Sequence, residues 1–289
     1  MAHDAGAAAQ LRPALTLFAA LVAAGAIVTG TQAGFAAMLG APDFAATSAA
    51  WQETVFTLLL FGAMLAVAAV GLTLDHSWRR LGGSDPARMA AAGLGIGIAG
   101  VLLSTMLAAV AGPVGAGVTA SPGLLAIAGG TLLVLFQASV EELYFRGWLQ
   151  PGLSRAWGDR VGLLVTAAAF SALHMFGGAL SMLSIVNLML GGLLFGLLAQ
   201  RSGGIMLAVG AHFGWNWSEG IGLGLVPNPG VGSFGALYDV DLRGAASWGG
   251  SAEGLNASLA MTFVLVALLI PVAIWRGPAR RPIAPGPRG

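Results

Sequence analysis

The sequence predicts an all-α, polytopic membrane protein, and three observations lead to this fold class. Hydrophobic residues make up 57% of the 289-residue chain and charged residues only 9%, whereas a soluble domain has roughly 25% charged residues. The mean hydropathy is +0.83, which indicates that lipid solvates much of the surface. Finally, apolar stretches of about 20 residues, the length of a spanning helix, follow one another with short connections.

Eight of these stretches are predicted to form a bundle of transmembrane helices. They cover residues 14–38, 54–74, 89–112, 124–150, 161–178, 181–200, 204–224 and 257–275. Residues 1–275 are therefore expected to form one transmembrane domain. Residues 276–289, which are rich in proline, are predicted to be a disordered cytoplasmic tail. The one sizeable external loop is predicted at residues 225–256.

The first stretch has two interpretations. A basic residue precedes it, and Thr31-Gln32-Ala33 resembles a signal-peptide cleavage site. The apolar run nevertheless continues to Met38, which favours a helix that is retained.

The distribution of basic residues predicts the orientation. All 13 basic residues are arginines, and an even number of helices places both termini on one side. If that side is cytoplasmic, the external loops contain only Arg243, and the cytoplasmic segments contain Arg12, Arg79, Arg80, Arg88, Arg155, Arg160, Arg201, Arg276, Arg280, Arg281 and Arg288. This is the bias that the positive-inside rule describes. Together with the lysine-free composition, it predicts a bacterial inner-membrane protein with cytoplasmic termini and no nucleic-acid partner.

Ionisable side chains inside spanning helices indicate function, because each costs about 2.5–3.5 kcal/mol to insert. The stretch 124–150 contains Glu141, Glu142 and Arg146, and the next stretch contains His174, four residues after Phe170. The stretch 204–224 contains His212, Asn216 and Glu219. Cysteine is absent, which excludes thiolate metal sites and cysteine nucleophiles.

Helical spacing assigns different surroundings to these groups. Residues four apart share a helix face, so Glu142 is expected to pair with Arg146. Glu141 lies about 100° further round the helix, so it is expected to face a cavity while Glu142 is paired. His212, Asn216 and Glu219 form one polar stripe. The predicted bounds place His174 deeper than Glu141, a mismatch that a longer fourth helix would remove.

Two carboxylates, two histidines and an asparagine suit peptide-bond hydrolysis. This reaction needs an activated water, a proton donor for the leaving nitrogen and hydrogen-bond donors for the oxyanion. A glutamate in a poorly hydrated cavity is a suitable general base. A histidine and an asparagine on one helix face can donate to the oxyanion.

These residues resemble the motifs of the CAAX-protease and bacteriocin-processing family of intramembrane glutamic endopeptidases. E-E-x-x-x-R is matched by Glu141, Glu142 and Arg146; F-x-x-x-H by Phe170 and His174; H-x-x-x-N by His212 and Asn216. The resemblance covers about residues 124–224. It implies an eight-helix bundle with a catalytic cavity open to the cytoplasm.

The resemblance also implies roles for the six residues. Glu141 and His174 would activate the water, His212 and Asn216 would form the oxyanion hole, and Glu142 with Arg146 would hold the site together. No cofactor or metal is implied, and the expected partner is a membrane-anchored protein or peptide in the lipid bilayer. The role of Glu219 stays open, as do the substrate and the oligomeric state.

Two other functions remain compatible with the residues. A zinc peptidase could use two histidines and a glutamate as ligands, although the H-E-x-x-H helix is absent. A proton-coupled transporter could use buried carboxylates and histidines as a relay, although no internal repeat is visible. The resemblance favours the peptidase.

Overall fold

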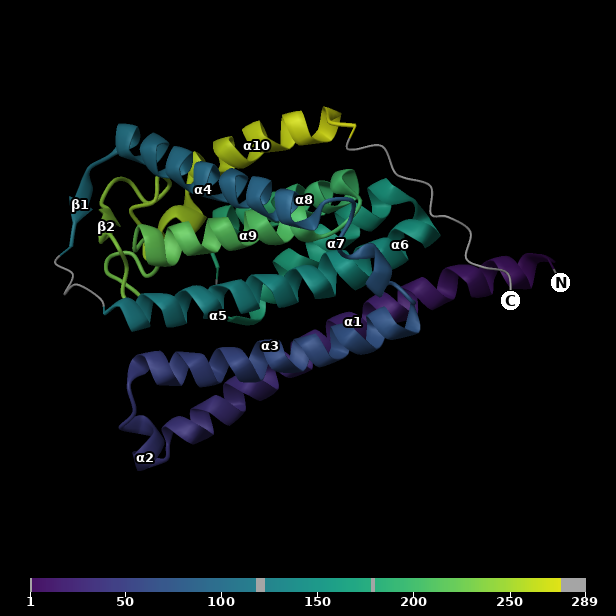
Figure 1. The fold of residues 1–289 in the computed structure, drawn as a ribbon, viewed down its shortest axis with the longest axis horizontal. Helices are drawn as coiled ribbons and strands as arrows, with labels where there is room; N and C mark the ends of the chain where they lie inside the picture. The colour runs from purple at the N-terminus through teal and green to yellow at the C-terminus, as the bar shows by residue number, and fades with distance from the viewer. Residues whose placement is uncertain (1, 118–122, 178–179, 277–289) are drawn as a thin grey trace.

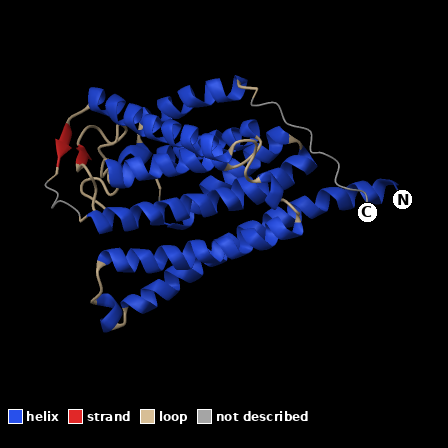
Figure 2. Cartoon of the chain, viewed as in Figure 1, coloured by secondary structure: helices blue, strands red, loops and turns tan. Residues whose placement is uncertain are grey.

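The computed structural model describes residues 2–117, 123–177 and 180–276, and it confirms the all-α membrane fold (Figure 1). The tail predicted at residues 276–289 lies outside the described residues apart from Arg276. The helices are α1 (Ala2–Leu39), α2 (Pro42–Ala45), α3 (Ala49–Leu74), α4 (Pro86–Ala111), α5 (Leu124–Glu142), α6 (Gln150–Trp157), α7 (Asp159–His174), α8 (Met182–Ser202), α9 (Met206–Trp217) and α10 (Leu259–Ile274). Two short antiparallel strands, β1 (Val114–Ala116) and β2 (Val240–Leu242), pair at one end (Figure 2).

All eight predicted stretches are helical, but they differ in length. Among the described residues, five helical segments are long and apolar enough to cross a membrane: Pro13–Leu39, Ala49–Leu74, Pro86–Ala111, Leu124–Trp157 and Met182–Ser202. The stretches predicted at 161–178, 204–224 and 257–275 are shorter than expected, because α7 and α10 have 16 residues each and α9 has 12. At 1.5 Å per residue, α9 is about 18 Å long, and the segment 225–256 occupies space beyond its end (Figure 1).

The fourth helix is longer than predicted, which removes the expected mismatch in depth. After α5 the chain continues without a break through a π-helical turn, η2 (Leu143–Leu149), into α6. Pro151 follows this turn and lacks the N–H that an α-helix would use at its position. Such wide turns are frequent at functional sites, and this one contains Arg146.

The two ends of the bundle differ in charge. The α3–α4, α6–α7 and α8–α9 connections and the end of α10 lie at one end, together with the start of α1 (Figure 1). We call this the arginine end, because arginines cluster there. Those that the structure describes as surface-accessible are Arg79, Arg80, Arg88, Arg155, Arg160, Arg201 and Arg276. The opposite end, called the loop end, has α2, β1, β2 and residues 225–256. Its only arginine among the described residues is Arg243.

Helix α1 is part of the bundle. Ala20 and Ala24 on this helix are fully buried. The hydroxyl of Tyr144 donates a hydrogen bond of 2.6 Å to the carbonyl oxygen of Ala20. Ala20 and Ala24 share a buried apolar cluster with Tyr144, so α1 contacts the rest of the bundle.

Helices α4 and α9 are in backbone contact through glycines. A Cβ at Gly93 or Gly97 would collide with the backbone of α9 at Leu207 or Ala211, and a Cβ at Gly210 would collide with the backbone of α4. Gly93 and Gly97 thus form a close-packing face of small residues on α4. This contact places α9, which carries His212 and Asn216.

The first prediction concerns this glycine contact. Gly97→Ala should lower the free energy of unfolding by roughly 1–3 kcal/mol, the usual cost of overpacking, because the new methyl group meets the backbone of α9. Gly95→Ala is the matched control, since Gly95 is exposed on the same helix with open space around it. Thermal unfolding in detergent measures both variants, and equal stability of the two would contradict the proposed packing.

Residues 225–256 are folded onto the bundle. Asn228 is buried, and its side chain bonds to the backbone of Leu242, Gly249 and Ser251 at 2.8–3.2 Å. Glu253 accepts hydrogen bonds from the backbone N–H of Ser181 and, at 2.5 Å, from the hydroxyl of Ser184. Since these serines lie at the start of α8, Glu253 fastens the loop to that helix.

The second prediction is a pH dependence of this attachment. Burial raises the pKa of Glu253, but the hydrogen bonds from Ser184 and Ser181 outweigh burial and hold the pKa below its ordinary value of 4.5. A carboxylate with a lowered folded-state pKa stabilises the fold above its ordinary pKa, and this contribution is lost as the pH falls through the lower value. Limited proteolysis of the loop should therefore be slow at pH 5 and above and accelerate at lower pH. Glu253→Gln should be cleaved faster at neutral pH, and a wild-type rate for this variant would disprove the attachment.

Candidate active site

A buried ion pair lies where α5 passes into η2. Arg146 Nη1 is 2.8 Å from Glu142 Oε1, and both side chains are fully buried. The second guanidinium nitrogen donates to the carbonyl oxygen of Gly192 on α8 at 3.1 Å, and the guanidinium carbon lies 4.6 Å from the centre of the Phe170 ring. The predicted pairing of Glu142 with Arg146 is confirmed, and it connects α5 to α7 and α8.

His212 on α9 joins this ion pair. Its Nδ1 is 2.8 Å from Glu142 Oε1, and its ring stacks on Phe195 with the centroids 4.7 Å apart. A carboxylate can only accept, so Nδ1 carries a hydrogen and the tautomer of a neutral ring is fixed. Nε2 then points at Glu141, 3.6 Å from Oε2.

Glu141 differs from Glu142 as predicted, because it lines a cavity. Its Oε1 accepts a hydrogen bond of 3.3 Å from Gln137, one helical turn earlier. Its Oε2 is buried and has no hydrogen-bond partner among the described residues. Buried carboxylate oxygens are rarely left in this state, so Oε2 is an acceptor available to a water or substrate.

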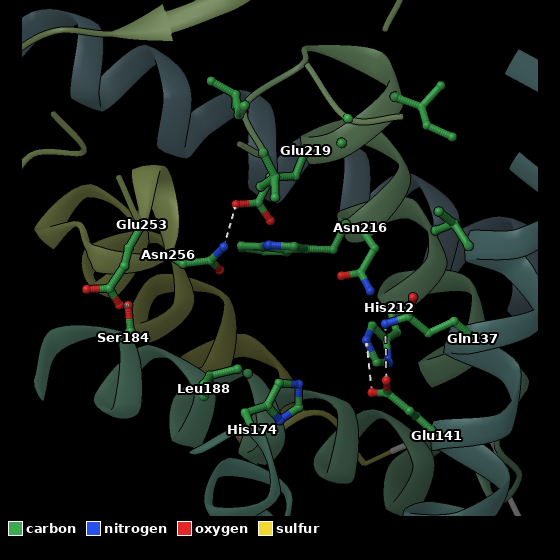
Figure 3. A pocket seen from close by; sticks show the side chains of 18 of the residues that line it. Gln137, Glu141, His174, Ser184, Leu188, His212, Asn216, Glu219, Glu253 and Asn256 are labelled. Atoms are coloured by element: carbon green, nitrogen blue, oxygen red, sulfur yellow. Dashed lines mark hydrogen bonds and ion pairs between the residues drawn. The ribbon is translucent and has the colours of Figure 1, made fainter. Parts of the chain in front are cut away.

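The cavity has a volume of about 590 Å³, within the range of ligand-binding pockets. Four of the six predicted site residues line it, namely Glu141, His174, His212 and Asn216 (Figure 3). Glu142 and Arg146 lie behind this wall and contact the site through His212. Leucine, valine and phenylalanine side chains make up much of the remaining lining.

His174 and Asn216 complete the polar part of the cavity. His174 is the last residue of α7, and its Nδ1 is 2.8 Å from the carbonyl oxygen of Phe170. Its Nε2 is therefore the ring nitrogen left for the cavity. Asn216 is half-buried, and its amide lies beside His212 (Figure 3).

Glu219 also lines the cavity, as the helical stripe predicted. It lies in a second π-helical turn, η4 (Ser218–Gly222), and is buried. The side-chain amide of Asn256, from the loop, donates to Glu219 Oε1 at 3.0 Å. Glu219 thus bonds to the loop and makes no hydrogen bond to the Glu142 cluster.

Several cavity residues were not assigned to the site by sequence reasoning. Gln137 lines the cavity, and its position four residues before Glu141 was the available signal. Glu53, Ser184, Glu253 and Asn256 also line the cavity. They come from α3, α8 and the loop, and no local spacing pattern relates them to the motifs.

The cavity opens toward the loop end. Its deepest residues, Glu141 and His212, are 5% and 4% exposed, whereas Val226 at its edge is 45% exposed. Glu53 and Ala252 at the edge are also exposed. Within the described residues, no connection at the arginine end contributes to the lining. The start of α1 and the end of α10 lie at the arginine end, whereas the cavity opens at the loop end. The two expectations, cytoplasmic termini and a cavity open to the cytoplasm, therefore exclude each other.

Comparison with known families agrees with the motifs. Residues 123–218 match the family model described as Rce1-like, type II CAAX prenyl endopeptidase. This segment is similar to the CAAX protease family. It covers about a third of the chain and contains all six predicted site residues, whereas Glu219 lies just beyond it. The CAAX protease resemblance is thereby confirmed, and the family is one of endopeptidases. No curated protein and no solved structure gives a significant match.

The third prediction tests the buried ion pair. Arg146→Ala should destabilise the protein by roughly 3–5 kcal/mol, because it leaves Glu142 buried without its charge partner. The control is Arg155→Ala, which breaks an ion pair with Asp75 in which the arginine side chain is 47% exposed. Exposed pairs contribute about 0–1 kcal/mol. If thermal unfolding shows similar losses for the two variants, the central role of Arg146 is wrong.

Proposed function

We propose that the protein is an intramembrane endopeptidase that hydrolyses a peptide bond of a membrane-associated protein or peptide, with Glu141 activating the water. The observation that carries this proposal is the buried Oε2 of Glu141 in the wall of a cavity inside the bundle, which accepts no hydrogen bond from the part of the chain that the structure describes. A water at this oxygen would be oriented, shielded from bulk solvent and close to a proton acceptor.

The proton balance of the cluster supports this role. With Glu141, Glu142 and Arg146 ionised, the cluster has one negative charge in excess. One further proton, on Glu141 or on His212, makes it neutral, and Glu141 Oε2 and His212 Nε2 lie 3.6 Å apart, so the two groups are direct neighbours for its exchange. When the water oxygen attacks the peptide carbonyl carbon, Glu141 takes its proton. That proton then goes to the leaving nitrogen as the C–N bond breaks.

The oxyanion would be stabilised from α9. Asn216 lies one helical turn after His212 and has an amide N–H that can donate, and a protonated His212 Nε2 can donate as well. His174, on α7, would hold the water from a second direction. Glu142 and Arg146 position His212 and contact no substrate.

Direct catalysis by glutamate is favoured over zinc by the donor geometry. Within the described residues, no three histidine, aspartate or glutamate side chains converge as metal ligands do. His212 also directs one nitrogen to each of two carboxylates, one of which is bonded to Arg146. A cation at this position would compete with the guanidinium group.

The fourth prediction tests this mechanism in purified, detergent-solubilised protein with a library of membrane-anchored peptides. Glu141→Gln should reduce cleavage by roughly 10²–10⁴-fold, since general-base catalysis contributes about that much. Asn216→Ala should reduce it by roughly 10²–10³-fold, the usual cost of one oxyanion donor. Glu219→Gln is the matched control outside the proposed chemistry and should retain most of the activity.

A strong chelator separates the glutamic mechanism from the zinc alternative. Cleavage that persists in chelator and is lost in Glu141→Gln is the expected result. Loss in chelator with recovery on adding zinc would instead make the histidines ligands. Full activity of Glu141→Gln would refute the assignment of the base.

A further inference from the structure

We propose that the cavity receives its substrate from the extracytoplasmic side of the membrane. The substrate class is then a membrane-anchored polypeptide whose cleaved segment lies outside the cytoplasm. This inference rests on the proposed peptidase function and specifies the side on which that function acts.

The first step is the direction of the opening. Exposure increases along the cavity wall from Glu141 and His212, which are buried, to Val226, Glu53 and Ala252, which are not. These three edge residues come from the loop 225–256 and from the start of α3, and both lie at the loop end (Figure 1). A polypeptide therefore reaches Glu141 from the loop end.

The second step is the orientation of the bundle. The seven described, surface-accessible arginines of the arginine end lie in short connections or within a few residues of helix ends, where the positive-inside rule applies. The loop end contributes Arg243 alone among the described residues, and Asp241 pairs with it at 2.9 Å. The rule therefore places the arginine end in the cytoplasm and the opening of the cavity outside.

The charge of the cavity is consistent with this side. Glu53 and Glu253 line the cavity near its exposed edge, and the described lining includes no arginine. Anionic lipid headgroups of the cytoplasmic leaflet attract basic segments. They do not attract an acidic rim, because both carry negative charge. The same rim would not repel a neutral or cationic peptide segment arriving from outside.

The absence of cysteine makes the orientation directly measurable. Ala252→Cys introduces one thiol at the edge of the cavity, and Ser84→Cys introduces one in the exposed α3–α4 connection at the arginine end. Both positions are exposed and lie outside the proposed catalytic machinery. A membrane-impermeant maleimide added to intact bacterial spheroplasts should label Ala252→Cys, and labelling of Ser84→Cys should be lost unless the membrane is permeabilised. The reverse pattern would overturn the inference.

A cleavage measurement then tests access. Right-side-out and inverted vesicles with full-length protein are given a lipid-anchored peptide library that cannot cross the membrane, with Glu141→Gln vesicles as background. Cleavage confined to right-side-out vesicles supports extracytoplasmic access, and cleavage confined to inverted vesicles refutes it. If solubilised protein cleaves nothing, the proposed function fails, while cysteine labelling still decides on which side the cavity opens.

Discussion

The carboxylate of Glu142 is the constraint on which the rest of the site depends. A fully buried charge is stable only when it is paired, and here the partners come from two helices: Arg146 on the continuation of α5 and His212 on α9. Arg146 in turn bonds to α8. One buried negative charge thus holds α5, α8 and α9 in register, and it orients His212 so that its second nitrogen faces Glu141.

Much of the site could be predicted because its essential pairs are local on one helix. The four-residue spacing of Glu142 and Arg146 predicted their contact, and the 100° step predicted that Glu141 would face elsewhere. Family motifs then connected three helices that no spacing relates. The contact of Glu142 with His212 could not be predicted. The two residues are 70 positions apart in the sequence, and their contact depends on how α5 and α9 pack against each other.

The outer half of the cavity could not be predicted for a similar reason. Residues 225–256 contain no periodic pattern, and their fold depends on single anchors such as Asn228 and Glu253. Helices α7, α9 and α10 were predicted too long. For α9 the reason is that apolar residues continue past its end, through the π-helical turn η4, toward this segment. The opening of the cavity was assigned by family resemblance and the orientation by arginines, and only the packed structure shows that these two assignments conflict.

The glycine contact between α4 and α9 restricts one wall of the cavity. Two helices in backbone contact cannot slide or rotate without steric overlap, so α9 is a fixed wall. The opposite wall is the first half of α3, whose far end is fastened where Gly71 packs against the Trp148 ring. The contact between α4 and α9 lies outside the cavity, yet it sets where His212 and Asn216 stand, so a packing face without polar groups determines the position of the polar ones.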